Sequence, residues 1–158
     1  MRYVFIPFTI INATLKNSLN DKLQVRGDAY KIQAHHKGLL QIFTSEFSNN
    51  NTFSVYNDQA LSDNTVIACE DSEYLRGILA VNDKSAACIE MESAGIYNAD
   101  YSRNKTKYCV YTIRGISDKA NTAKDDTHHK LAINNGSKTL SKLIRFFIEK
   151  YDVIKKIK

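Results

Sequence analysis

The chain has 158 residues and a formal net charge of +5, a length that suits a single domain with one hydrophobic core. Hydrophobic residues make up 43% and charged residues 25% of the chain, which excludes a disordered composition, and the longest apolar runs are far too short to span a membrane. The N-terminus lacks a signal-peptide pattern, and three cysteines without a CxxC spacing are typical of reduced thiols. We therefore expect a cytoplasmic protein with one domain over residues 1–158.

Four lysines in the last nine residues contribute much of the net charge. A basic cluster can bind nucleic acid, but lysines also complement the dipole at the end of a helix. We favour the second explanation and expect neither nucleic acid nor a membrane as a partner.

The first half of the chain predicts a strand and a helix. Residues 2–11 are rich in β-branched and aromatic side chains, which favours a strand with a ladder gap at Pro7. Residues 12–27 are polar and predict irregular structure. Apolar residues at steps of three and four then predict an amphipathic helix that begins at a capping Asp28 and ends in the asparagine-rich run 48–52.

The second half predicts strands that alternate with helices. Short apolar runs suit buried parallel strands at 65–69, 86–89 and 108–113. Helices are predicted from residue 71 or 72, over 92–101, and from residue 125 or 127 to the end. The closing helix has an apolar stripe made of Gly136, Leu140, Leu143, Ile144, Phe147, Ile148 and Tyr151. This alternation predicts an α/β fold with a mixed, largely parallel central sheet flanked by helices.

Polar residues cluster directly after the last two predicted strands. Residues 89–95 read IEMESAG and residues 114–118 read RGISD. Ligands of open α/β sheets bind beyond the carboxyl ends of the strands, so both clusters are expected to face one pocket. Glu92 can accept hydrogen bonds from both hydroxyls of a ribose, and Met91 offers an apolar wall. Asp118 can bond a purine nitrogen, or act as a general acid if burial raises its pKa.

Each cluster also has an ordinary structural explanation. An acidic residue such as Glu92 at the start of a helix is favourable because of the helix dipole. Ser117 and Asp118 are typical of a turn, and Arg114 with Asp118 can be a local ion pair. Spacing alone leaves both explanations open.

The four histidines predict no metal site. His35-His36 and His128-His129 have no cysteine or carboxylate at zinc-ligand spacing around them. His36 lies on the apolar face of a predicted helix, where a packing role is the better interpretation. The cysteines lie in predicted strands and are interpreted as inert packing residues.

Residues 90–95 (EMESAG) and 112–120 (TIRGISDKA) resemble two consecutive signatures of the purine and uridine phosphorylase family. That family includes the methylthioadenosine/S-adenosylhomocysteine nucleosidases. The order of the signatures, their separation and the long helix after them also match, and two ordered signatures are more specific than one short motif. The resemblance is strong over residues 86–148 and weaker before them.

The resemblance implies cleavage of a ribosyl N-glycosidic bond, by a nucleosidase or a phosphorylase, with a purine as the favoured base. Met91 and Glu92 then bind the ribose, while Asp118, with Ser117 beside it, binds the base and assists its departure. Tyr74 is a candidate for stacking on the base. No cofactor is implied, apart from inorganic phosphate as the co-substrate of a phosphorylase. The expected partners are a nucleoside or nucleotide and further copies of the chain.

The sequence departs from the family pattern at its start. Family members begin with a strand carrying an acidic residue, which activates water in the nucleosidases, and a glycine-rich segment follows that helps to hold phosphate in the phosphorylases. Neither is found in this sequence, so we expect the later part of such a domain, truncated at the N-terminus. Two alternatives stay open: a catalytically incomplete module that binds or senses nucleotides, or a fragment that acts with a partner chain.

Overall fold

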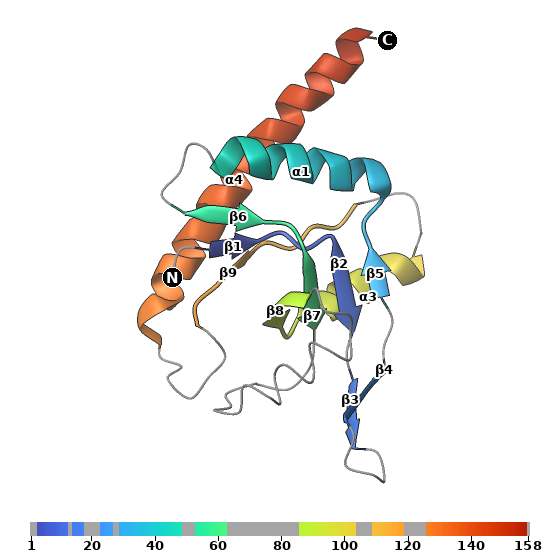
Figure 1. The fold of residues 1–158 in the computed structure, drawn as a ribbon. Helices are drawn as coiled ribbons and strands as arrows, with labels where there is room; N and C mark the ends of the chain where they lie inside the picture. The colour runs from blue at the N-terminus through green and yellow to red at the C-terminus, as the bar shows by residue number, and fades with distance from the viewer. Residues whose placement is uncertain are drawn as a thin grey trace.

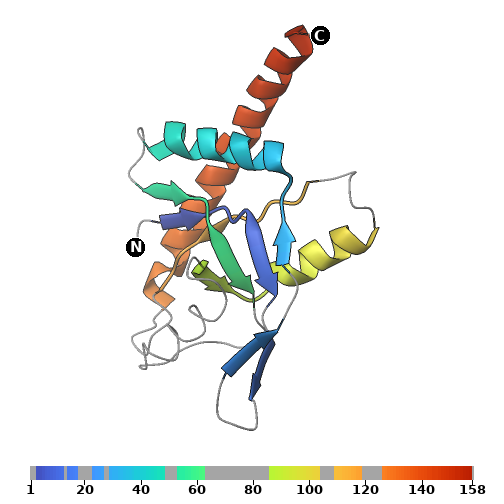
Figure 2. The same cartoon turned by 45° about the vertical axis from the view of Figure 1, so that its right-hand side comes forward.

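The computed structural model describes residues 3–12, 14–17, 23–26, 29–48, 53–62, 86–103, 109–118 and 126–157. In this part of the chain, helices pack against two short sheets, and a hairpin extends away from them (Figure 1, Figure 2). The strand predicted at 65–69, the short helix after it, Tyr74 and the Asp28 cap lie outside the described residues.

The predicted first strand is divided at Pro7 into β1 (Tyr3–Phe5) and β2 (Thr9–Asn12). Pro7 has no backbone N–H to continue the ladder, and its side chain is fully buried at the division. β6 (Ser54–Tyr56) runs parallel to β1, and β7 (Gln59–Ser62) runs parallel to β2. The backbone N–H groups of Ile6 and Phe8 donate hydrogen bonds to the carbonyl oxygens of Tyr56 and Asp58, so the two chain segments stay paired between the sheets. The predicted ladder gap is therefore the junction between two sheets.

Both sheets are mixed. The first has the order β6-β1-β9, in which β9 (Arg114–Gly115) is antiparallel to β1. The second has the order β5-β2-β7-β8, in which β5 (Ala29–Lys31) is antiparallel to β2, and β8 (Ala86–Glu90) is parallel to β7. The hairpin consists of β3 (Thr14–Asn17) and β4 (Leu23–Arg26). A mixed α/β fold is thus confirmed, with parallel pairing in β1–β6, β2–β7 and β7–β8.

The predictions for residues 12–33 are wrong. Residues 12–27, expected to be irregular, contain the hairpin β3–β4. The helix expected from Asp28 begins later, as α1 (Ala34–Ser48). Residues before it form β5, which pairs with β2 and buries Tyr30 in the second core. This pairing is a long-range contact that overrides the local helical periodicity.

The strand predicted at 108–113 is also wrong. Residues 109–113 have no regular structure, and pairing is confined to β9. The carbonyl oxygen of Val110 accepts a hydrogen bond from the Tyr97 hydroxyl at 3.0 Å. This carbonyl is thus bonded to a side chain rather than to the backbone of a neighbouring strand. Tyr111 and Ile113 instead pack against the first core.

The remaining elements follow the prediction closely. β8 and α3 (Ser93–Arg103) confirm the strand at 86–89 and the helix at 92–101. The closing segment begins with a short 3-10 turn, η1 (Asp126–His128), and continues as α4 (His129–Ile157). No described helix is both long enough and apolar enough to cross a membrane.

Two apolar cores hold the described elements together. The first lies where β1 and β6 meet α1 and α4, and its buried members are Val4, Ile6, Leu40, Phe43, Phe47, Phe53, Val55, Leu143 and Phe146. The second lies where the second sheet meets α3, and its buried members are Ile10, Tyr30, Ala60, Cys88 and Tyr97. The thiol of Cys88 is free, and its burial raises its pKa to about 12, which agrees with an inert packing role.

The apolar stripe predicted on α4 faces two directions. Leu143 is buried in the first core and Phe147 is half-buried against it, as the stripe predicts. Leu140, Ile144 and Ile148 are 48%, 51% and 57% exposed, which the stripe does not predict. The C-terminal end of the helix also extends beyond α1 (Figure 1). One side of α4 is thus apolar and exposed to solvent.

Gly115 allows β9 to approach α4 closely. A Cβ added at Gly115 would lie 2.0 Å from the carbonyl oxygen of Ala132, which is α4 backbone. Any side chain at this position therefore displaces either β9 or the helix.

We expect Gly115→Ala to lower the free energy of unfolding by about 1–3 kcal/mol, the usual cost of overpacking. Gly38→Ala is the matched control, because nothing lies within 4 Å of a Cβ added at Gly38. In the interior of α1, alanine should raise stability by about 0.5–1 kcal/mol relative to glycine. Urea denaturation measures both values, and a Gly115→Ala protein as stable as the control would contradict the close packing.

Candidate functional site

Glu90, the last residue of β8, is the polar centre of the candidate site. Its side chain is 5% exposed. Its Oε2 atom accepts hydrogen bonds from the backbone N–H groups of Glu92 (3.0 Å) and Ser93 (2.8 Å), which have no partner inside the helix at the start of α3. The next N–H group, that of Ala94, donates to Oγ of Ser62 at 3.1 Å. The first turn of α3 is therefore fixed to the ends of β7 and β8.

This geometry assigns the helix-capping role to Glu90 rather than to Glu92. The side chain of Glu92 is 63% exposed, and its carboxylate contacts Arg114. The cap of α3 is thus the residue two positions earlier. Glu92 stands directly before the helix, where its charge is also favourable to the helix dipole.

Arg114, in β9, joins the two signature segments. Its Nη2 atom lies 2.5 Å from Oε2 of Glu90 and 2.5 Å from Oε2 of Glu92, and 3.5 Å from Oγ of Ser93. Arg114 therefore contacts residues of the EMESAG segment, whereas spacing alone suggests Asp118 as its partner. EMESAG and RGISD, which lie far apart in the chain, meet at this guanidinium.

The charge of Glu90 is stabilised by its surroundings. Burial opposes ionisation of the carboxyl group, but hydrogen bonds from Ser62, Ser93 and the Glu92 backbone outweigh burial and hold the pKa of Glu90 below its ordinary value. A general acid near neutral pH needs a raised pKa, so Glu90 is unsuited to proton donation. It is suited to anchoring a cation.

Three further predicted site residues lie close to this cluster along the chain, and Tyr74 lies outside the described residues. Met91 lies at the bend between β8 and α3 and is 40% exposed. Ser117 and Asp118 are half-buried and follow β9 without regular structure, and the Ser117 hydroxyl donates to Oδ2 of Asp118 at 2.8 Å. The structure thus places Met91 and Glu92 directly after β8, and Ser117 and Asp118 shortly after β9.

Glu90 and Arg114 are functional candidates that sequence reasoning did not single out. A signal for Glu90 exists, since an acidic residue two to three positions before the first helical N–H groups is placed to cap them. No local signal identifies Arg114, because its partners lie 22 and 24 residues away in the chain.

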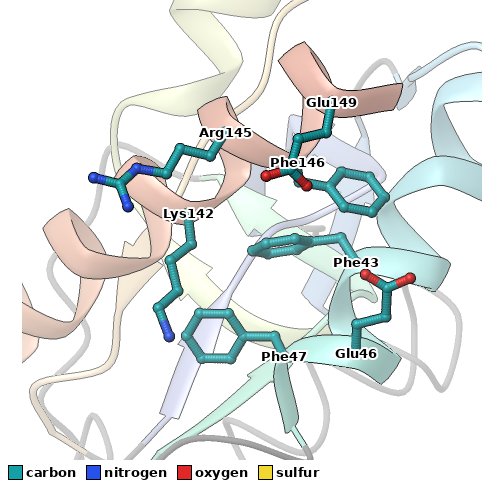
Figure 3. A pocket seen from close by; sticks show the side chains of 7 residues that line it. All are labelled: Phe43, Glu46, Phe47, Lys142, Arg145, Phe146 and Glu149. Carbon is teal, nitrogen blue, oxygen red and sulfur yellow. The ribbon is translucent and has the colours of Figure 1, made fainter. Parts of the chain in front are cut away.

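A groove of about 290 Å³ lies in another part of the molecule, between α1 and α4 (Figure 3). It is lined by Phe43, Glu46, Phe47, Lys142, Arg145, Phe146 and Glu149. The three phenylalanines belong to the first core and are almost completely buried, and Lys142 Nζ lies 4.8 Å from the ring centroid of Phe47. The groove therefore offers a ligand little apolar surface, and none of the predicted site residues lines it.

His36 has the packing role that the sequence predicts for it. Its Nδ1 atom forms a hydrogen bond with the Tyr111 hydroxyl, and its ring contacts that of Phe147. Burial, and then the charge of His35, lowers the pKa of His36. In the described residues, no three His, Cys, Asp or Glu side chains are grouped so that they could hold a metal ion.

Solved structures match the fold of this chain, although no protein-family model matches it and no curated protein matches it in sequence. The 5′-methylthioadenosine/S-adenosylhomocysteine nucleosidase of Neisseria meningitidis, in complex with methylthio-immucillin-A, has a TM-score of 0.67 and 17% identity over 89% of this chain and 60% of that chain. The S-adenosylhomocysteine nucleosidase of Streptococcus pyogenes, in complex with 5-methylthiotubericidin, has a TM-score of 0.64 and 16% identity over 95% and 61%.

A futalosine hydrolase mutant of Helicobacter pylori gives a TM-score of 0.62 at 11% identity, over 95% of this chain and 62% of that chain. The predicted nucleoside phosphorylase-like fold is therefore confirmed. The chain spans about 60% of the length of these structures.

Glu90 should make stability depend on pH in the acid range. Because its pKa is lower in the folded than in the unfolded chain, its contribution is fully present above the ordinary glutamate pKa of about 4.3 and is lost as pH falls through the folded pKa. We expect the wild type to be more stable than Glu90→Gln at neutral pH, and the difference to shrink below about pH 4. Urea titrations of both proteins across this range measure it, and a difference that does not vary with pH would contradict the assignment.

Proposed function

We propose that this chain binds a purine nucleoside and takes part in cleaving its N-glycosidic bond. The observation that carries the proposal is the contact of Arg114 with Glu90 and Glu92, because it joins the two signature segments at the ends of β8 and β9. The fold shared with the nucleosidases and the futalosine hydrolase supports it.

Each site residue has a defined role in this reaction. Glu92 accepts hydrogen bonds from the two ribose hydroxyls, and Met91 lies against the sugar. The Ser117 hydroxyl orients the Asp118 carboxyl group, and Asp118 donates a proton to a purine nitrogen as the glycosidic bond breaks. The bonding electron pair leaves with the base, and the sugar passes through an oxocarbenium-like state. Tyr74 is proposed to stack on the base.

The attacking nucleophile is water in a nucleosidase and inorganic phosphate in a phosphorylase, and neither reaction needs a cofactor. Base release from adenosine, measured with and without phosphate, separates the two. The free thiols of Cys88 and Cys109 agree with a reducing, cytoplasmic setting for this chemistry.

We expect Asp118→Asn to lower base release from adenosine by about 10²–10⁴-fold, because the amide cannot donate the proton that a carboxylic acid supplies. Glu149→Gln, an acidic position on α4 far along the chain from both signatures, should leave the rate unchanged. Chromatography of released adenine measures the rate, and circular dichroism checks the fold. Undiminished release by Asp118→Asn would remove Asp118 from the mechanism.

Calorimetric titration with adenosine tests the alternative of a catalytically incomplete sensing module. Binding by the wild type without any release of adenine would favour the sensor over the enzyme.

Assembly with another polypeptide is a second candidate function, and α4 is the observation that favours it. Ile133, Leu140, Ile144 and Ile148 are 70%, 48%, 51% and 57% exposed, and helical spacing places them on one side of the helix. Exposed apolar residues that gather on one side of a helix mark contact surfaces. We propose that a second copy of the chain covers this side of α4.

Light scattering should then give a mass above the 17.9 kDa of one chain. The double variant Leu140→Lys/Ile144→Lys should return it to the mass of one chain, because burying two lysines in an apolar contact is unfavourable. Asn134→Lys adds one lysine at an exposed position of α4 that does not belong to this apolar row and should leave the assembly intact. A wild type that is a monomer would contradict pairing between two copies.

A further inference from the structure

Glu90 and Arg114 form the closest polar contacts beside Glu92, yet neither has a role in the reaction proposed above. One guanidinium nitrogen of Arg114 lies 2.5 Å from both glutamates. The cluster therefore contains two negative charges and one positive charge, and one negative charge is left over. Which glutamate retains it decides what the cluster can bind.

The two glutamates have opposite environments. The side chain of Glu90 is 5% exposed, and that of Glu92 is 63% exposed. An ion pair is stronger where water is excluded, whereas an exposed pair is weakened by solvent. Its hydrogen bonds also keep Glu90 ionised, since its pKa lies below the ordinary value. Arg114 is thus held chiefly by Glu90, and the surplus negative charge lies on Glu92, which faces solvent.

We propose that Glu90 is a positioning residue for nucleoside binding: as the internal counter-ion of Arg114, it leaves Glu92 an anionic acceptor for both ribose hydroxyls. This inference rests on the proposed function. Glu90 does not touch the nucleoside. It acts through Arg114 and through the first turn of α3, which follows Glu92 directly and whose N–H groups it binds.

A matched control exists because α3 has a second cap. Ser62 accepts a hydrogen bond from the Ala94 N–H at 3.1 Å and also donates one to Glu90, but it carries no charge. Ser62→Ala therefore weakens the start of the helix and removes neither charge of the Glu90–Arg114 pair. If Glu90 served only as a cap, substitution of either residue would have the same kind of effect on binding.

The test compares the binding of adenosine and 2′,3′-dideoxyadenosine by titration calorimetry at neutral pH. The second nucleoside lacks the 2′- and 3′-hydroxyls that Glu92 is proposed to bind. Glu90→Gln keeps an acceptor oxygen for the helix N–H groups and removes the charge. We expect it to raise the Kd of adenosine about tenfold or more, as for a lost hydrogen bond to a charged group, and to leave the Kd of the dideoxynucleoside almost unchanged. Glu92→Gln should show the same selectivity. Ser62→Ala should lower the Tm without this selectivity.

The outcomes separate the two proposals. A wild type that binds neither nucleoside overturns the proposed function and this inference with it. Selective loss in Glu92→Gln but not in Glu90→Gln overturns the inference alone, and so does an equal loss of both ligands in Glu90→Gln. If Glu90→Gln does not fold, Glu90→Asp is measured instead. Aspartate keeps the charge, but its side chain is one methylene group shorter, so the carboxylate lies farther from Arg114. The same selective loss of adenosine binding is expected.

Discussion

A carboxylate buried at the end of a strand must be supplied with hydrogen-bond donors and a counter-charge, because an unpaired buried charge is very unfavourable. In this chain one oxygen atom of Glu90 receives two backbone N–H groups from the start of α3 and the guanidinium of Arg114 from β9. These donors belong to different elements, so their convergence fixes β8, α3 and β9 relative to one another. The rest of the candidate site depends on this convergence, since Met91 and Glu92 lie within the turn that Glu90 holds, and Ser117 and Asp118 follow the arginine.

The RGISD segment combines two kinds of constraint. Its arginine is required by charge, whereas its glycine is required by packing, because the backbone of α4 passes too close for any side chain at Gly115. The short strand β9 therefore has α4 on one side and pairs with β1. β1 is placed in turn by its pairing with β6 and by the first core. The backbone position of Arg114 is thus set by the sheet and the closing helix as well as by Glu90, and the two glutamates set the direction of its side chain.

Elements with local signals could be predicted from the sequence, and elements defined by long-range pairing could not. β8, α3 and α4 follow from a continuous apolar run or a helical period, which are properties of the segment itself. β5 depends on pairing with β2, and the irregular path at Val110 depends on a hydroxyl from Tyr97, so neither is visible in the local pattern. In the site, the acidic cluster after β8 could be recognised from its position. The difference in burial between Glu90 and Glu92 could not be predicted, because it depends on tertiary contacts with a distant part of the chain, including Arg114.

The site and the exposed side of α4 are physically connected. Near its N-terminal end, α4 contacts Gly115 through the backbone of Ala132 and so sets the position of β9. The exposed apolar row begins at the next residue, Ile133, and continues along the same helix to Ile148. The helix that carries the exposed apolar row is therefore also the helix whose backbone sets the position of β9 and, through β9, of Arg114.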